Sequence, residues 1–405
     1  MDALGKPKAN KGRSSSSRLT VSGRVGLSRT RWFDAVGRSV TPADALIDES
    51  DRLISLGVTE IAVRLAIDSA SFERAAANLL RASGISIGEE TLRKLTEDEG
   101  KLLLCAQQTE QMELDFSAKD CTTDQTPDQQ PTTRVYLGSD GVLVPVITDA
   151  EKQKRRTKAV EKRRVLPRPK GRRRRALPSG KRGADQSYKE FKIVTYYDQD
   201  QKHRWVRATR RNHRHAGKLM RQGAAELHLR AAAEKIAITD GAKWIGSEID
   251  RNVGCLDAKV LDFYHLAEHV HAARRAVFGE LAPPGTAWAD ELLHAIRHEG
   301  YDPFWQKLTE TRSATRSPGK RSALDQLMHY VAQRRDMLDY ADWSRRGWDI
   351  GSGSTESMCK ALTRRLKQRG MRWDADNAEA IMALETLEQT DGWQNWLVYR
   401  AAISN

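Results

Sequence analysis

The chain contains few cysteines, and they are widely spaced. Its 405 residues include only Cys105, Cys121, Cys255 and Cys359, and no two of these form a CxxC pair. This spacing excludes a recognisable zinc knuckle. Disulfide frameworks are typical of small secreted chains, so the pattern favours a protein of a reducing compartment.

Long hydrophobic runs are also absent. The longest apolar stretches, such as residues 142–147, are far shorter than the roughly 20 residues that a membrane-spanning helix needs. Residues 1–17 lack the apolar segment of a secretory signal. Hydrophobic residues make up 39% of the chain and the mean hydropathy is −0.64. We therefore expect a protein that does not bind membranes, with enough chain for two or three domains.

Basic residues outnumber acidic ones, and the excess is confined to two segments. Lys and Arg total 68 against 54 Asp and Glu, which gives a formal net charge of +14. Residues 152–184 hold 16 Lys and Arg with one acid, and residues 1–33 hold eight with one, so the rest of the chain has a net charge of −8. Both segments lack the apolar period of a packed element, which predicts that they are disordered.

The basic segment 152–184 is predicted to contact nucleic acid through its phosphates. Cationic side chains that displace counterions from phosphates gain affinity without reading sequence. The densest run is Arg172, Arg173, Arg174 and Arg175. A solvated linker is the alternative, but repulsion among so many cations favours an anionic partner. We therefore expect a cytoplasmic, nucleoid-associated protein.

A helical DNA-binding domain is predicted over residues 34–105, after a disordered basic tail over residues 1–33. Thr41-Pro42 is typical of a helix start, because a capping hydroxyl precedes a proline at the first helical position. Residues 71–82 present an apolar face, and Gly84 is typical of the residue that ends a helix.

The next helix is predicted to complete a helix-turn-helix. Ser86 to Glu89 has the pattern of a capping box. Two short helices joined by a glycine-containing turn are typical of this motif, which places Arg93 and Lys94 near the start of the candidate recognition helix. An ordinary small helical bundle is the alternative. The polar residues 106–133 are predicted to be a linker.

After the linker the spacing of apolar residues changes from a helical pattern to one typical of strands, which predicts an α/β fold. Segments rich in β-branched and aromatic residues predict strands over 134–137, 141–147, 191–197, 204–208, 235–239 and 258–261. We expect a mixed sheet with helices on both faces. The first part of this core is predicted over residues 134–265 and includes the basic loop 152–184. An all-helical insertion is predicted over residues 266–350, and C-terminal helices over residues 351–405 complete the core.

Three carboxylates occupy positions typical of a ligand-binding edge. Asp140 and Asp240 lie beside glycines at predicted strand ends, and Glu356 opens a helix after Gly351-Ser352-Gly353. Acids that converge on one sheet edge repel one another unless they share cations, and hard oxygen ligands suit Mg²⁺ or Mn²⁺. Two such ions serve in-line phosphoryl displacement. Taken singly, each acid is better explained by a turn or by a favourable helix dipole.

Four stretches make the chain similar to a known family. They are Gly138-Ser139-Asp140-Gly141, Thr239-Asp240-Gly241-Ala242-Lys243-Trp244-Ile245, the D-x-x-H box Asp262-Phe263-Tyr264-His265, and residues 351–357 with 369–373. Over residues 136–384 the chain resembles DDE-type insertion-sequence transposases of the ISKra and ISLre families, and more distantly the Mutator-like enzymes. The resemblance implies an RNase H-like core whose helical insertion precedes a catalytic glutamate. It also implies that Asp140, Asp240 and Glu356 are catalytic and hold two Mg²⁺ or Mn²⁺ ions.

The function implied by this resemblance is DNA transposition. The protein is expected to cut and join phosphodiesters at the terminal repeats of an insertion sequence and in target DNA, as a homo-oligomer. His265 either acts at the scissile phosphate or only orders the strand–helix turn by bonding Asp262. His265 and His269 share a helix face, but no third ligand lies near in the sequence, which disfavours zinc. A structure-selective nuclease on the same fold and a catalytically silent DNA-binding regulator are the alternatives.

Overall fold

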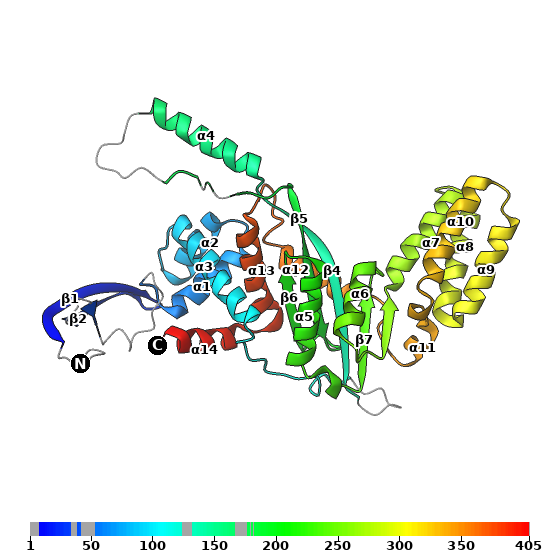
Figure 1. Ribbon diagram of the computed structural model, residues 1–405, viewed down its shortest axis with the longest axis horizontal. Helices are drawn as coiled ribbons and strands as arrows, with labels where there is room; N and C mark the ends of the chain where they lie inside the picture. The colour runs from blue at the N-terminus through cyan, green and yellow to red at the C-terminus, as the bar shows by residue number, and fades with distance from the viewer. Residues whose placement is uncertain are drawn as a thin grey trace. The chain divides into compact units, whose positions relative to one another are not determined.

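The chain forms two compact units, each assembled from separate stretches of sequence (Figure 1). A computed structural model describes residues 8–33, 39–41, 53–123, 132–166, 176–178, 180 and 182–404. Unit 1 comprises Met1–Glu113, Val144–Lys189 and Leu362–Asn405, and unit 2 comprises Leu114–Leu143 and Glu190–Ala361. None of the described helices has the length and apolar character that crossing a membrane requires.

Unit 1 begins with a β-hairpin where the sequence predicts a disordered tail. Strands β1 (Ala9–Thr20) and β2 (Gly23–Phe33) pair antiparallel, and β3 (Ser39–Val40) pairs with β2. The Thr20 hydroxyl donates to the Gly23 carbonyl (2.8 Å), and Gly23 has the positive φ of +100° that the turn requires. The prediction is wrong for these residues because a ladder satisfies backbone groups even where the side chains are polar.

Three helices of unit 1 follow, and their limits agree only in part with the predicted ones. They are α1 (Leu56–Asp68), α2 (Phe72–Ser83) and α3 (Glu89–Gln108). The Ser71 hydroxyl caps α2, and Gly84 ends it with a φ of +70°. The predicted capping box is wrong, because Gly88 occupies the cap of α3 and supplies no side chain. Pro42, in the predicted helix start, lies outside the described residues.

The C-terminal helices α13 (Ala375–Thr390) and α14 (Trp393–Ser404) also belong to unit 1. A Cβ at Gly100 of α3 would overlap the carbonyl group of Ala380 on α13, so helices α3 and α13 approach each other closely. The Trp396 indole donates to the buried Glu99 carboxylate (2.8 Å). The assignment of all of residues 351–405 to the sheet domain is therefore wrong from Leu362 onward.

Part of the predicted disordered basic loop is a helix. Helix α4 (Asp149–Val165) opens with a capping box in which Thr148 and Glu151 exchange hydrogen bonds. The buried Lys152 pairs with Asp374, and Arg372 pairs with Glu151, which fastens the first turn of α4 to the rest of unit 1. The sequence predicts disorder because apolar residues do not recur here at helical spacing. The helix forms nevertheless, because the capping box and these ion pairs stabilise it without a buried apolar face. Arg172–Arg175 lie outside the described residues.

Unit 2 contains a five-stranded mixed sheet, which confirms the predicted α/β class. Its strands are β4 (Arg134–Pro145), β5 (Tyr188–Tyr197), β6 (Arg204–Thr209), β7 (Glu234–Thr239) and β8 (Ala258–Leu261), in the order β6-β5-β4-β7-β8. Strands β4, β7 and β8 run parallel, and β5 and β6 form an antiparallel hairpin. The predicted break before Gly141 is wrong, because β4 continues through Asp140.

Helices α5 (His213–Glu226) and α6 (Lys243–Asn252) cover one face of this sheet. Their buried side chains pack on Val135 and Leu137 of β4. Ala118 and Cys121 pack into the same core, so residues 114–123 of the predicted linker belong to the sheet domain. Side chains alternate along a strand, so Tyr136, Gly138 and Asp140 point toward the opposite face.

A run of helices separates β8 from the predicted glutamate. It comprises α7 (Phe263–Phe278), α8 (Pro283–His294), a π-helical turn (Ala295–Glu299), α9 (Tyr301–Ala314), α10 (Pro318–Ala332) and α11 (Tyr340–Arg345). Pro283 and Pro318 stand at the first helical positions, where a missing N–H costs nothing. The last helix of unit 2, α12 (Gly353–Thr363), carries Glu356.

Candidate active site

The sheet register aligns three aspartates across neighbouring parallel strands. Gly138 of β4 is paired with Ile238 of β7, so two residues further on Asp140 falls opposite Asp240. In the same way, Thr239 is paired with Leu261 of β8, which places Asp262 beside Asp240. Neighbouring strands lie about 4.8 Å apart, so the three positions form one row where β7 and β8 end.

Glu356 is brought to this row by the glycine- and serine-rich run that precedes α12. The Ser352 hydroxyl donates to Asp262 Oδ2 (2.7 Å), and the Phe263 N–H donates to the Ile350 carbonyl (2.9 Å). The run is therefore held against the end of β8. Helix α12 begins at Gly353, so Ser354 and Thr355 lie inside its first turn.

Gly138 is required where α12 meets β4. A Cβ at this position would overlap the hydroxyl of Thr355 and lie 2.9 Å from the hydroxyl of Thr195. Thr355 is buried and directly precedes Glu356. Strand β4 and the first turn of α12 can approach this closely only because residue 138 has no side chain, and Asp140 lies two residues beyond on the same face.

The acids lie within electrostatic range of one another. Burial is the main cause that raises the pKa of Asp140, and the charges of Asp240, Glu356 and Glu190 raise it further. The Gly141 N–H, which donates to Asp140 Oδ1 (2.6 Å), opposes the shift. A cluster of carboxylates that destabilise one another's charged forms fits a hard divalent cation such as Mg²⁺ or Mn²⁺, which would relieve the repulsion.

Glu190 is a fourth acid that the sequence analysis does not single out. It lies on β5, where its carboxylate accepts a hydrogen bond from Lys192 Nζ (2.6 Å). A Cβ at Gly141 would overlap the Glu190 side chain, so this glycine admits the carboxylate beside Asp140. Nothing in the sequence around Glu190 marks it, since only the pairing of β5 with β4 brings it near.

The D-x-x-H box is ordered by its aspartate. Asp262 Oδ1 accepts from the Tyr264 N–H (2.9 Å), which caps α7, and its other oxygen accepts from Ser352. His265 Nδ1 lies 3.5 Å from Glu268, and its ring centroid is 5.5 Å from that of His269. The proposed bond between His265 and Asp262 is therefore wrong. His265 remains partly exposed one turn along the helix from the aspartate.

Arg334 is a second residue missed from the sequence. It follows α10, and its guanidinium donates to the Gly241 carbonyl (2.8 Å) and lies 4.0 Å from the centre of the Tyr330 ring. A cavity of about 350 Å³ lies beside this contact, next to Asp240. It is lined by Thr239, Gly241, Ala242, Lys243, Gly246, Gln333, Arg334 and Met337. The lining includes two cations, which favours an anionic ligand.

The two predicted DNA contacts on α3 are paired with acids of the same helix. Arg93 contacts Glu90 (2.9 Å) and Glu97 (2.6 Å), and Lys94 contacts Glu90 (3.3 Å). The hydrogen bond from Arg93 is the main cause that lowers the pKa of Glu90 to about 2. That α3 recognises a DNA sequence stays a prediction. Because Arg93 and Lys94 are already paired with acids, they offer DNA little uncompensated positive charge.

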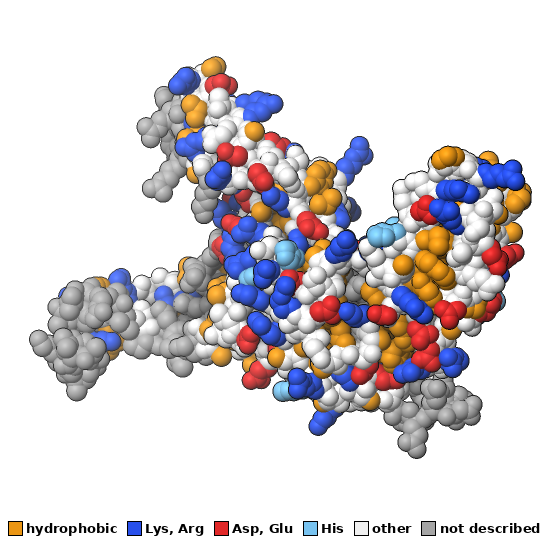
Figure 2. All heavy atoms as spheres, turned by 45° about the vertical axis from the view of Figure 1, so that its right-hand side comes forward, with side chains coloured by type: hydrophobic (Ala, Val, Ile, Leu, Met, Phe, Trp, Pro, Cys, Tyr) orange, Lys and Arg blue, Asp and Glu red, His pale blue; other side chains and the backbone are white. Residues whose placement is uncertain are grey.

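Helix α4 presents a denser set of exposed cations. Five basic side chains point to solvent along it: Lys154, Arg155, Lys158, Lys162 and Arg164. Figure 2 shows Lys and Arg side chains on the surface at the upper left of the view. Positive charges repeated along a helix suit a polyanion, because each phosphate contact releases counterions.

Comparison with known proteins finds only distant structural likeness. No family model and no curated protein match the chain. One solved structure, the Drosophila P element transposase strand transfer complex, is similar over 83% of this chain and 92% of that chain, at 10% identity and a TM-score of 0.35. A likeness this weak decides neither the fold nor the function.

Proposed function

We propose that the chain is a DDE transposase and that unit 2 is its RNase H-like catalytic domain. One observation supports this above the others: the register places Asp140 opposite Asp240, and the charges of Asp240 and Glu356 both act on Asp140. The mixed sheet with its first strand at the centre, and the helices between β8 and Glu356, agree with the fold that the sequence resemblance implies.

Asp140, Asp240 and Glu356 would hold two divalent cations, Mg²⁺ or Mn²⁺. When bound, such ions activate a water or a 3′-hydroxyl and stabilise the leaving oxygen of an in-line displacement. The protein orients the ligands: the Gly141 N–H fixes Asp140, and the Ala242 N–H donates to Asp240 Oδ1 (2.8 Å). The first turn of α12 positions Glu356.

The cations around the acids would bind the DNA backbone. Lys243 and Arg334 line the cavity beside Asp240, where they can neutralise a phosphate of the reacting strand. His265, partly exposed near the end of β8, is placed to contact the scissile phosphate. The exposed cations of α4 would hold flanking DNA without reading its sequence.

The test is a cleavage assay on DNA that flanks the gene, where terminal repeats are expected. Purified protein is incubated with Mg²⁺ and a plasmid that carries these flanks. Asp140→Asn, Asp240→Asn and Glu356→Gln should each abolish strand cleavage and preserve DNA binding. The matched control is Asp250→Asn, which removes an exposed carboxylate of α6 that pairs with Lys259 of β8 (2.7 Å). Cleavage retained by one of the three variants removes that residue from the site.

Products separate the alternatives. A transposase joins the cut ends to a second plasmid, whereas a structure-selective nuclease releases ends without joining them. A silent regulator binds the flanking DNA but shows no cleavage that depends on Mg²⁺ or on the three acids. Measuring the mass of the complex on end DNA tests the expected homo-oligomer.

A further inference from the structure

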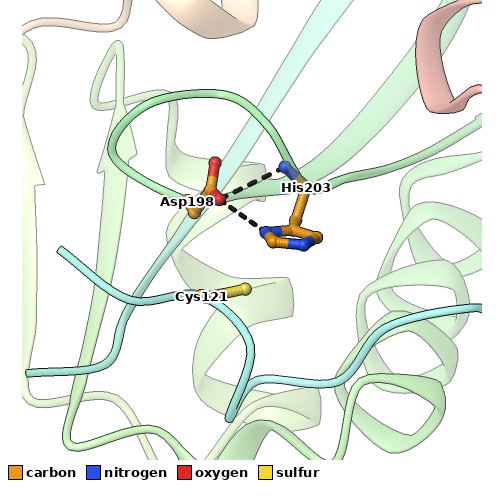
Figure 3. Close-up of side chains that lie close together, drawn as sticks. All are labelled: Cys121, Asp198 and His203. Carbon is orange, nitrogen blue, oxygen red and sulfur yellow. Dashed lines mark hydrogen bonds and ion pairs between the residues drawn. The ribbon is translucent and has the colours of Figure 1, made fainter. Parts of the chain in front are cut away.

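A second group of potential metal ligands lies at the far end of β5 from Glu190. It consists of Cys121, Asp198 and His203, whose ligand atoms all lie within 4.8 Å of one another (Figure 3). Cys121 and Asp198 are almost completely buried, at 1% and 2% exposure, and His203 is partly exposed. Three different ligand types thus converge at a site that is largely closed to solvent.

The β5–β6 hairpin supplies two of these side chains. Asp198 directly follows β5, and its Oδ2 accepts from the His203 N–H (3.2 Å) and lies 2.7 Å from His203 Nδ1. These contacts by themselves would close the turn. Asp198 Oδ1, however, is also buried and has no hydrogen-bond partner among the described residues. A buried carboxylate oxygen without a partner costs free energy, so a turn-closing role leaves half of this carboxylate unexplained.

The third ligand comes from a segment distant in sequence. Cys121 belongs to residues 114–123. The Arg134 N–H of β4 donates to the Cys121 carbonyl (2.8 Å), and the Ala118 N–H donates to the carbonyl of Leu227 at the end of α5 (2.7 Å), so the segment is fixed to the strand and to the helix beside it. Phe116 of the same segment packs against the His203 ring, with 5.0 Å between centroids. Burial is the main cause that raises the pKa of the Cys121 thiol to about 12. A metal ion would have to displace its proton to solvent.

We propose that Cys121, Asp198 and His203 bind one transition-metal ion, with Zn²⁺ the best match. A thiolate, an imidazole and a carboxylate form a ligand set that zinc accepts, and the sulfur excludes a hard ion such as Mg²⁺. The ion would satisfy Asp198 Oδ1 and leave one position for a water. Because the ion would join residues 114–123 to the β5–β6 turn, its binding would stabilise unit 2.

This site is separate from the acids of the candidate active site. Glu190 and Asp198 lie eight positions apart along extended chain, which corresponds to about 26 Å. A structural ion at Asp198 would therefore not be one of the ions that serve phosphodiester chemistry, and the two sites can be emptied independently.

Metal content of the purified full-length protein tests the proposal. Protein prepared in zinc-containing medium and passed through gel filtration should retain about one Zn²⁺ per chain by mass spectrometry. Protein loaded with Co²⁺ should show the near-ultraviolet charge-transfer absorption of a thiolate ligand. Cys121→Ser, Asp198→Asn and His203→Gln should each lower zinc affinity at least 10-fold, since each removes one of three ligands. Asp198→Asn preserves shape and serves if Cys121→Ser does not fold.

Two controls make the result specific. Cys255→Ser removes another partly buried cysteine that packs against the same core and should retain the zinc. The triple variant Asp140→Asn/Asp240→Asn/Glu356→Gln should also retain it, so a failure of the proposed transposase chemistry would not affect this measurement. Wild-type protein that binds no zinc, or equal zinc in all of the ligand variants, would overturn the proposal.

Discussion

Gly138→Ala should impair the candidate active site without touching an acid. The new methyl group would overlap the Thr355 hydroxyl, and an ordinary contact requires this hydroxyl to retreat by about 1.6 Å. Thr355 precedes Glu356 in the first turn of α12, so the glutamate would move with it. Misplacement of a catalytic group by about 1 Å lowers a rate by about 100-fold.

The cost in stability follows from the same overlap. Overpacking a buried position costs about 1–3 kcal/mol. Replacing glycine in a strand recovers about 0.5–1 kcal/mol, because alanine loses less conformational freedom on folding. Overpacking therefore dominates, and we expect a net loss of about 1–2 kcal/mol together with the much larger fall in cleavage rate.

Thermal unfolding and plasmid cleavage measure the two effects. The control is Gly254→Ala, at an exposed glycine where an added Cβ meets nothing within 4 Å, which should behave as wild type. Thr355→Ala should restore much of both quantities in the double variant, with a coupling energy of about 1–2 kcal/mol between the two positions. A Gly138→Ala protein as active and as stable as wild type, or a double variant with additive losses, would refute this account of why residue 138 is glycine.

Three further predictions concern charge. Burial and neighbouring acids raise the pKa of Asp140, so its ionisation destabilises the folded protein as pH rises through that pKa. Without divalent cations, the Asp140→Asn variant should therefore have a higher melting temperature than wild type at neutral pH and the same melting temperature at acid pH. Burial raises the pKa of Glu385 on α13 to about 8, so stability should fall as pH rises from about 4.5 to 8. Glu385→Gln should then stabilise unit 1 by roughly 3–5 kcal/mol at pH 8 in denaturant unfolding, and an unchanged pH dependence would contradict this. Replacing the five exposed cations of α4 by glutamine should make the slope of log affinity for DNA against log salt shallower by up to about 4.5. An unchanged slope would show that α4 does not contact phosphate.

Local sequence patterns were sufficient to predict those features that depend on neighbours in the chain. The end of α2 at Gly84 is such a feature, because a glycine of positive φ lets the last backbone groups be satisfied within one turn. Strands beside Asp140 and Asp240 were also expected, because runs of β-branched residues next to Asp-Gly pairs are local signals, although β4 continues through the predicted break at Asp140. The hairpin at residues 9–33 and helix α4 were missed, because ladder pairing and ion pairs stabilise them without an apolar period.

The arrangement of the site depended on tertiary structure. The sequence by itself determined which acids were candidates, through their places beside strand ends and through the motifs that resemble a known family. It could not show that Thr355 packs on Gly138, that Glu190 and Arg334 lie beside the acids, or that Cys121 meets Asp198 and His203. These contacts join residues about 50 to more than 200 positions apart. They arise only when the strand order and the buried faces of the sheet are settled, because nothing in the local chain pays the entropy of closing such long loops.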